Sequence, residues 1–345
     1  MQEEERGKEK IQAEKERTKR NFAIRLVLSI VMGSGFACFI KMGRIYLIAL
    51  IIFLNCVVFY EVLKVFLRIY PIKNILRFAA NSSRRDALMP SGFFWCCFFM
   101  ISISKYSRIM IFPGKLAMVH RIVVPLQFVW IGWFVLLLRG GAYRMKIFHL
   151  SMVLVAIIGL LECTEAAINN VDRSIYCFVY PCFLVAINDT FAYLIGARFG
   201  QTPLTLLSPK KTVEGFIGGG ISTVLLCVPV SYVLKMFLLH TPKLQYTDLL
   251  ILSILASVVA PIGGILASGY KRAFKAKHFS RILPGHGGIS DRIDCQLIMQ
   301  LVSNLYLSGI VRKQTVKGFL AEIKQHLTDK EQLDLARMIV LAYKQ

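Results

Sequence analysis

Residues Leu249–Leu266 read LLILSILASVVAPIGGIL, a run of 18 residues without a charged side chain. A helix needs about 20 apolar residues to cross the hydrocarbon of a bilayer, and only helices or closed barrels satisfy their own backbone hydrogen bonds there. This run therefore predicts a membrane-spanning helix. Seven further runs have a similar length and composition, at Phe22–Lys41, Tyr46–Leu67, Gly92–Phe112, Ile122–Leu138, Ile147–Cys163, Ile175–Ile195 and Phe216–Leu239.

Two segments qualify this pattern. The run Gly92–Phe112 is the weakest, because Lys105 and Arg108 interrupt it. A ninth run, Leu297–Val311, is short and fits a tilted or partly buried helix. We predict an all-α polytopic membrane protein with about eight to nine transmembrane helices. Its three parts are a charged cytoplasmic tail, a transmembrane domain and an amphipathic helical tail, at residues 1–21, 22–311 and 312–345.

Composition supports the membrane assignment. Hydrophobic residues make up 56% of the chain and charged residues 18%, whereas soluble domains are nearer half apolar and a quarter charged. The chain has 42 Lys and Arg against 20 Asp and Glu. In a multispanning protein this excess is typical of loops that face anionic lipid and anionic substrates, so we expect no nucleic-acid partner. The cysteines form no CxxC pair, so we expect reduced thiols rather than disulfides or metal ligands.

The positions of the cations predict the topology. If the N-terminal tail lies in the cytoplasm, the cytoplasmic loops hold most of the Lys and Arg residues, as the positive-inside rule requires. The loops after the sixth and eighth runs then lie on the same membrane face, where they can form one site. The cytoplasmic cations are Arg68, Lys73, Arg77, Arg84, Arg85, Arg139, Arg144, Lys146, Arg198, Lys210 and Lys211, with those that follow Leu266.

The segment Ser268–Asp294, which follows the run Leu249–Leu266, reads SGYKRAFKAKHFSRILPGHGGISDRID. Its basic cluster alone would suit a cytoplasmic loop that lies on anionic lipid. That explanation does not account for the His-Gly-Gly turn or for the Asp-Arg-x-Asp after it. We therefore interpret the segment as a site for an anion and a metal ion. The residues on which this rests are Lys271, Arg272, Lys275, Lys277, Arg281, His286, Asp291, Arg292 and Asp294.

A second candidate block is Asn188–Gly220, NDTFAYLIGARFGQTPLTLLSPKKTVEGFIGGG. Asp189 is predicted at the cytoplasmic end of an apolar helix, where an unpaired carboxylate is costly and therefore a functional candidate. Ser208 is predicted to cap a helix that starts at Pro209. Backbone amides at that start and two lysines would form a phosphate site, although a capped helix with interfacial lysines is the alternative. The first helical turn and the residues after it would contain Lys210, Lys211, Thr212 and Glu214.

The two blocks together resemble the CDP-diacylglycerol synthases, also called phosphatidate cytidylyltransferases, of the eukaryotic type. The resemblance covers Pro181–Gln296, roughly a third of the chain. It departs from the family pattern at His278, where Asp is usual, and at Tyr270, where an aliphatic residue or Phe is usual. The matching residues are Ser268, Lys271, Arg272, Lys277, Pro284, His286, Gly287, Gly288, Asp291, Arg292 and Asp294, with Asn188, Asp189, Ala192, Tyr193, Ser208, Pro209, Lys210, Lys211, Thr212, Glu214 and Gly215 upstream.

The resemblance implies that phosphatidic acid attacks the α-phosphorus of CTP, giving CDP-diacylglycerol and pyrophosphate for phospholipid biosynthesis. It implies a homodimer in the endoplasmic reticulum membrane, with the site facing the cytoplasm. Mg²⁺, with room for a second cation, is the expected cofactor, and carboxylates are the ligands it prefers. The candidate metal ligands are Asp189, Asp291 and Asp294. The candidates for binding the triphosphate or the lipid phosphate are Lys210, Lys211, Lys271, Arg272, Lys277 and Arg292, with Ser208, Thr212, Ser268, Gly287 and Gly288.

Several alternatives stay open at this point. His286 would bond a phosphate or orient an aspartate, or it is a neutral structural histidine. Glu61 and Lys64, in the second run, would contact substrate or form a local ion pair at i,i+3. Two other function classes are a membrane lipid or polyprenol kinase that uses CTP, and an anion transporter. A transporter would typically show repeated halves, and the sequence has no visible repeat.

Overall fold

The computed structural model of the chain is mainly helical in the part that it describes. Those residues contain no strand, only an isolated bridge between Pro203 and Thr212. An all-α polytopic membrane protein, as the sequence predicts, is confirmed. The described residues are 27–68, 91–110, 113–138, 143–205, 208, 211–238, 241–242, 244–280, 287–326 and 329–343.

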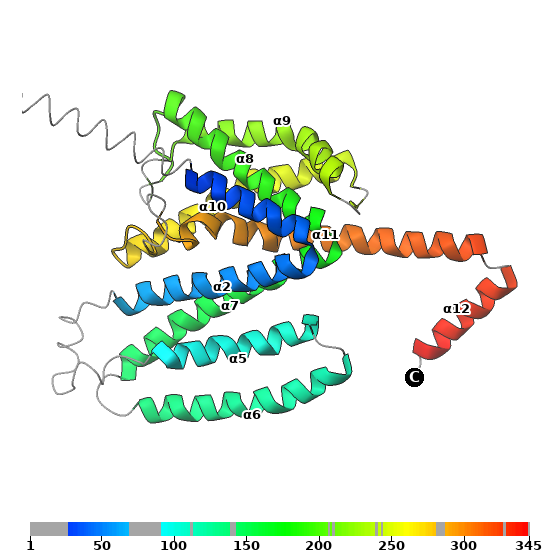
Figure 1. Cartoon of the computed structure of the whole chain (residues 1–345), viewed down its shortest axis with the longest axis horizontal. Helices are drawn as coiled ribbons and strands as arrows, with labels where there is room; N and C mark the ends of the chain where they lie inside the picture. Colours follow the sequence, from blue (N-terminus) through cyan, green and yellow to red (C-terminus); the bar gives the residue numbers. More distant parts are fainter. Residues whose placement is uncertain are drawn as a thin grey trace, which may run out of the picture.

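Within the described residues, each of the eight apolar runs lies in a helix. Of the described helices, five are long and apolar enough to cross a membrane, and three more contain shorter apolar segments. The first helix, Val27–Met42, has no label in Figure 1. The labelled ones are α2 (Arg44–Arg68), α5 (Ser91–Met110), α6 (Pro113–Leu137), α7 (Tyr143–Arg173), α8 (Ile175–Phe199), α9 (Val213–Phe237) and α10 (Tyr246–Ala273).

Local capping explains where two of these helices start. Ser174 separates α7 from α8, and its hydroxyl accepts the N–H of Tyr176, which satisfies one of the free donors at the new helix start. At the start of α10, the carboxylate of Asp248 accepts the N–H of Gln245 at 2.8 Å in a capping box. The chain can therefore reverse between neighbouring spans with very short connections.

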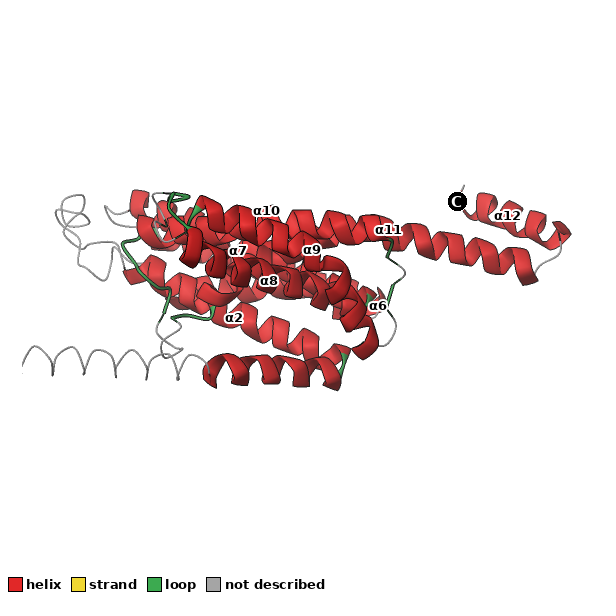
Figure 2. Ribbon diagram, turned by 90° about the horizontal axis from the view of Figure 1, so that it is seen from above, coloured by secondary structure: helices red, strands yellow, loops and turns green. Residues whose placement is uncertain are grey.

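The ninth expected helix is much longer than its apolar run. The helix α11 extends over Ser290–His326 and α12 over Asp329–Tyr343. The prediction of a short helix at Leu297–Val311 is therefore wrong in its length, since that run is the middle of α11. In Figures 1 and 2 the first half of α11 lies in the bundle, whereas its second half and α12 extend beyond it.

Polar side chains hold the first half of α11 in the bundle. Asn170 of α7 donates to the side-chain oxygen of Gln300 at 2.8 Å and to the hydroxyl of Ser303 at 3.2 Å. Gln300 in turn donates to the carbonyl of Phe178 in α8 at 2.9 Å. Interhelical hydrogen bonds of this kind are common inside membrane bundles.

The cation that weakens the third run has partners on a neighbouring helix. Lys105 of α5 lies 2.6 Å from a carboxylate oxygen of Glu162 and 2.8 Å from one of Glu165, both on α7. An ionisable residue within a span is usually paired or faces a polar space. The lysine that weakens the apolar signal of α5 thus belongs to an interhelical ion cluster.

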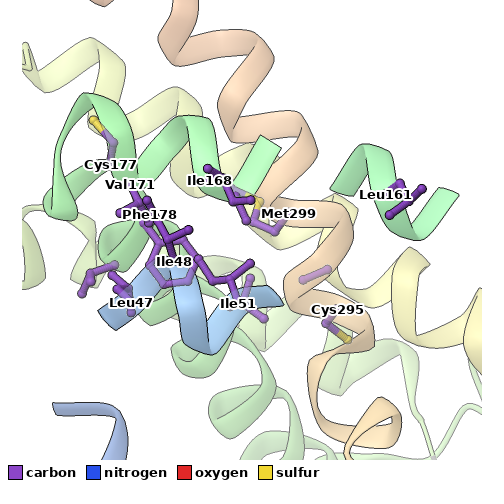
Figure 3. Close-up of a cluster of buried hydrophobic side chains, with 14 of the residues drawn as sticks. Leu47, Ile48, Ile51, Leu161, Ile168, Val171, Cys177, Phe178, Cys295 and Met299 are labelled. Atoms are coloured by element: carbon purple, nitrogen blue, oxygen red, sulfur yellow. The ribbon is translucent and has the colours of Figure 1, made fainter. Parts of the chain in front are cut away.

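The core joins helices that are distant in the sequence. Figure 3 shows Leu47, Ile48 and Ile51 of α2 beside Phe178 of α8, with Met299 of α11 close by. All nine cysteines lie in the described residues, where no disulfide joins any of them. In Figure 1 the ends of α2, α8 and α10 and the start of α11 lie at the same end of the bundle. That end carries both candidate blocks. The predicted tail at 1–21 lies outside the described residues.

Candidate functional site

The helices α8 and α9 cross so closely that side chains do not fit between them. A Cβ on Gly219 would lie 2.9 Å from the carbonyl oxygen of Asn188, and one on Gly215 would lie 2.6 Å from that of Ala192. Glycines therefore allow the two backbones to approach, as small residues often do in membrane proteins. This packing fixes Asp189, the neighbour of Asn188, relative to the start of α9.

The start of α9 differs from the prediction. The helix begins at Val213, with Thr212 as its cap, and the hydroxyl of Thr212 accepts the N–H of Gly215 at 3.2 Å. The prediction of Ser208 as the cap is wrong, because Ser208 lies in the preceding loop, where its carbonyl accepts the N–H of Lys211 at 3.0 Å. Contact with α8 decides between the two caps, since a Cβ on Gly200 would lie 2.6 Å from the hydroxyl of Thr212.

Glu214 holds the loop between α8 and α9. Its carboxylate accepts the backbone N–H of Gln201 at 3.1 Å and that of Thr202 at 3.2 Å. A carboxylate in the first turn of a helix is also favoured by the helix dipole. Glu214 therefore positions the loop that carries Lys211.

Asp189 lies where the two blocks meet. It is inside α8, which continues to Phe199, so its prediction at the end of a helix is wrong. Lys211, Arg292 and Asp294 lie near enough for their charges to act on it. Within the described residues Asp189 makes no hydrogen bond or ion pair. A carboxylate without such a partner in an apolar helix is a candidate for binding a ligand.

Lys211 reaches from the loop to α10. A Cβ on Gly264 would lie 2.8 Å from the ammonium nitrogen of Lys211, so the absence of a side chain at this position makes room for the cation. Its charge acts on both Asp189 and Asp294. One cation from the second candidate block thus acts on carboxylates of both α8 and α11.

Asp294 lies in the first turns of α11, outside the five spans. Its Oδ1 accepts the N–H of Cys295 at 2.8 Å, and the thiol of the same cysteine also bonds the carboxylate. Burial raises the pKa of Asp294 above the ordinary value, although Lys271 and Lys211 oppose that effect. The carboxylate is therefore held in an environment that favours an additional positive partner.

Asp291 is committed to contacts within the protein. Its Oδ1 lies 2.7 Å from the ammonium of Lys271, and its Oδ2 accepts the N–H of Gly288 at 3.0 Å. The Nδ1 of His278 lies 3.5 Å from the same Oδ2. Gly287 has a φ of +88°, and a Cβ on it would lie 2.8 Å from Oδ2. Asp291 therefore fixes the Gly-Gly turn and Lys271, which leaves Asp189 and Asp294 as the better metal candidates.

Glu61 of α2 holds the start of α11 in place, a role that the sequence alone left undecided. Its buried carboxylate accepts the N–H of Ile289 at 3.0 Å and that of Ser290 at 2.8 Å, and it also accepts the hydroxyl of Ser280. The suggested ion pair between Glu61 and Lys64 is absent within the described residues, since Lys64 donates to the hydroxyl of Tyr60. A lone glutamate in an apolar run was the signal that pointed to it.

The remaining predicted residues lie at the rim or outside the described part. The hydroxyl of Ser268 donates to the carbonyl of Gly264 in its own helix at 2.7 Å. Arg272, Lys277 and Arg292 are exposed. Lys210 and His286 lie outside the described residues.

The carboxylates of the site could hold a metal ion only together with other ligands. Among the described residues, no group of three His, Cys, Asp or Glu side chains could hold a metal. Mg²⁺ usually takes only one or two carboxylates and completes its shell with water and substrate phosphates. Asp189 and Asp294, which interact through their charges, fit that requirement. A protein cage for the metal is not needed.

Comparisons with known proteins point to one family. The model of the Cytidylyltransferase family matches residues 23–310. Phosphatidate cytidylyltransferase of Saccharomyces cerevisiae is 30% identical, over 96% of this chain and 83% of that protein. Phosphatidate cytidylyltransferase 1 of Arabidopsis thaliana is 28% identical over 91% and 85%, and phosphatidate cytidylyltransferase 2 of Bos taurus is 28% identical over 92% and 84%. Since the match covers the bundle and both candidate blocks, this chain belongs to the cytidylyltransferase family.

Proposed function

We propose that this protein is a phosphatidate cytidylyltransferase, which converts CTP and phosphatidic acid into CDP-diacylglycerol and pyrophosphate. The observation that carries the proposal is that Asp189 of α8, Lys211 of the loop before α9 and Asp294 of α11 come together at one end of the bundle. Each of the relatives named above is called a phosphatidate cytidylyltransferase. A site of this kind suits two polyanionic substrates, one of which comes from the membrane.

The reaction needs charge stabilisation more than covalent chemistry. An oxygen of the phosphatidate phosphate forms a bond to the α-phosphorus of CTP, and the bond from that phosphorus to the β-phosphate bridge breaks, so that pyrophosphate leaves with its electron pair. Fixed cations that already point at the phosphates lower this barrier. We assign that role to Lys211, which lies against α10, and to Lys271, which Asp291 holds in place.

Mg²⁺ is the proposed cofactor, held by Asp189 and Asp294 with phosphate oxygens and water. When bound, it would neutralise charge on the triphosphate. The two carboxylates would hold it in place, because α8 and α11 fix their backbones. Arg292, whose charge acts on Asp189, would balance the negative charge that remains.

The proposed location follows from the charge distribution. The described residues at the end of the bundle that holds the site include the cations Arg198, Lys211, Lys271 and Arg272, and the positive-inside rule supports a cytoplasmic position for that end. Anionic lipid and cytoplasmic CTP would both reach it there. We propose residence in the endoplasmic reticulum membrane and a homodimer on the family resemblance; mass photometry in nanodiscs measures the oligomeric state.

Radiolabelled CTP tests the reaction directly. Purified protein in mixed micelles with phosphatidate and Mg²⁺ should transfer label from [α-³²P]CTP into an organic-soluble product. Label from [γ-³²P]CTP should appear in pyrophosphate. Transfer of γ-label to lipid would instead indicate a CTP-dependent kinase. Uptake of intact CTP into sealed vesicles without any lipid product would indicate a transporter.

A further inference from the structure

An apolar cavity of about 290 Å³ lies between α2, α7, α10 and α11. Its walls are mainly aliphatic and aromatic, with Val62 and Phe66 of α2, Leu160 of α7 and Leu266 of α10 among them. Small-ligand sites are commonly apolar spaces of roughly 300 Å³ or more with a few polar groups at one point. This cavity has that character.

The polar end of the cavity coincides with the candidate site. Asp294 and Ser290, both at the start of α11, line it. The hydroxyl of Ser290 is buried and has no hydrogen-bond partner among the described residues. Phe279, another wall residue, lies under the ammonium of Lys271 at 5.3 Å from the ring centroid. A ligand with an anionic head and an apolar tail would therefore place the head near Lys271 and the tail among the helices.

The cavity is long and laterally accessible. Along α10 its lining extends from Gly263 to Phe274, which is roughly 16 Å at 1.5 Å per residue. Val155 of α7 and Leu266 of α10 line it and are 60% and 54% exposed. A side of the cavity thus faces the region that the hydrocarbon of the bilayer occupies. An elongated apolar chain can enter from that side without crossing a polar surface.

We propose that this cavity binds an acyl chain of the phosphatidate substrate and that Gly159 of α7 determines how much chain it accepts. The proposal rests on the proposed function. Gly159 lines the cavity, and a Cβ built on it meets no atom within 4 Å. A larger side chain at this position would project into open space and occupy the room that the chain needs. The phosphate groups near Lys271 would be unaffected.

The test compares long and short acyl chains in the variant Gly159→Leu. With dioleoyl phosphatidate, kcat/KM should fall roughly tenfold or more, since a few methylenes displaced from an apolar pocket change discrimination by about that factor. With dioctanoyl phosphatidate it should stay near the wild-type value, and the KM for CTP should not change. Gly132→Leu is the matched control, because Gly132 of α6 also has open space around it and does not line the cavity.

Photolabelling identifies the occupant independently of turnover. Phosphatidate with a diazirine at the end of one acyl chain should label α7, α10 or α11, and unlabelled dioleoyl phosphatidate should suppress that label. Equal labelling by the corresponding phosphatidylcholine, without competition, would show that bulk bilayer lipid fills the cavity and would overturn the proposal. Cross-linking to a second copy of the chain would do the same.

The two levels of the hypothesis fail differently. If the wild-type protein transfers no CMP to phosphatidate of either chain length, the proposed function is wrong. If the wild-type protein is active and Gly159→Leu lowers kcat/KM equally for both chain lengths, or for neither, the proposed acyl-chain pocket is wrong and the proposed function stands.

Discussion

The carboxylate of Glu61 in α2 accepts the backbone N–H of Ser290 at 2.8 Å, although the two residues are 229 positions apart. The N–H groups at the start of a helix have no partner within it, and here a glutamate from another helix supplies one. The start of α11 carries Asp291 and Asp294. The geometry of the candidate site therefore depends on a residue in the second span.

Glu61→Ala should lower both stability and turnover. The variant removes acceptors from the buried N–H of Ser290, the partly buried N–H of Ile289 and the hydroxyl of Ser280, at a cost of about 1–3 kcal/mol for each buried donor left unsatisfied. We expect a lower Tm in detergent and a lower kcat, with Glu61→Gln intermediate. Lys64→Ala, one turn away on the same helix, is the control. Unchanged kcat in Glu61→Ala would show that the start of α11 does not need this contact.

Asp189→Asn and Asp294→Asn should each reduce activity at limiting Mg²⁺ by at least about a hundredfold, equivalent to roughly 3 kcal/mol. The amide keeps the size of the side chain but removes the charge that a hard divalent ion requires. Asp172→Asn is a matched control, because Asp172 pairs with the exposed Arg44. Steady-state rates across a Mg²⁺ titration measure the effect. Near wild-type rates in both site variants would remove these carboxylates from the metal site.

The Mg²⁺ requirement should rise as the pH falls toward the acid range. Burial raises the pKa of Asp294 above its ordinary value of 3.8, so this carboxyl takes up a proton at a higher pH than an exposed aspartate does. The protonated form is neutral and binds Mg²⁺ poorly. The Mg²⁺ concentration for half-maximal activity, measured from pH 8 down to about pH 5, should therefore increase at the acid end. A constant requirement over that range would contradict the prediction.

His278→Asp should leave the preference between Mg²⁺ and Mn²⁺ unchanged. Nδ1 of His278 faces Asp291, which is already paired with Lys271, so a carboxylate at this position would compete for the same lysine. We expect kcat/KM to fall by less than about tenfold, because a screened like charge at this distance costs on the order of 1 kcal/mol. His278→Asn is the uncharged control. A change of preferred metal would instead make residue 278 a metal ligand.

Lys105→Met should destabilise the protein more than the loss of one surface cation would. The substitution leaves Glu162 and Glu165 of α7 without the ammonium that lies between them, and like charges left together near the membrane are unfavourable. We expect a Tm lower by several degrees. The triple variant Lys105→Met, Glu162→Gln, Glu165→Gln should recover most of that loss. Failure of the triple variant to recover would assign the loss to packing of Met rather than to charge.

The sequence by itself determined the helices and the chemistry of the site. As far as the structure describes them, the apolar runs are helical, because a backbone in hydrocarbon has few other ways to satisfy its hydrogen bonds. Asp189, Lys211 and Asp294 were also identifiable, because charged residues within or beside spans are costly and therefore informative. Their convergence followed from placing two loops on one membrane face.

Only the tertiary structure decided which residues hold the site together. A local pattern suggests Ser208 as a helix cap, but Thr212 is the cap because it packs against Gly196 and Gly200 of another helix. Likewise, Glu61 caps α11, and Asp291 is occupied by Lys271 and Gly288. Such assignments depend on contacts between distant segments, and short-range sequence patterns contain no information about which segments meet.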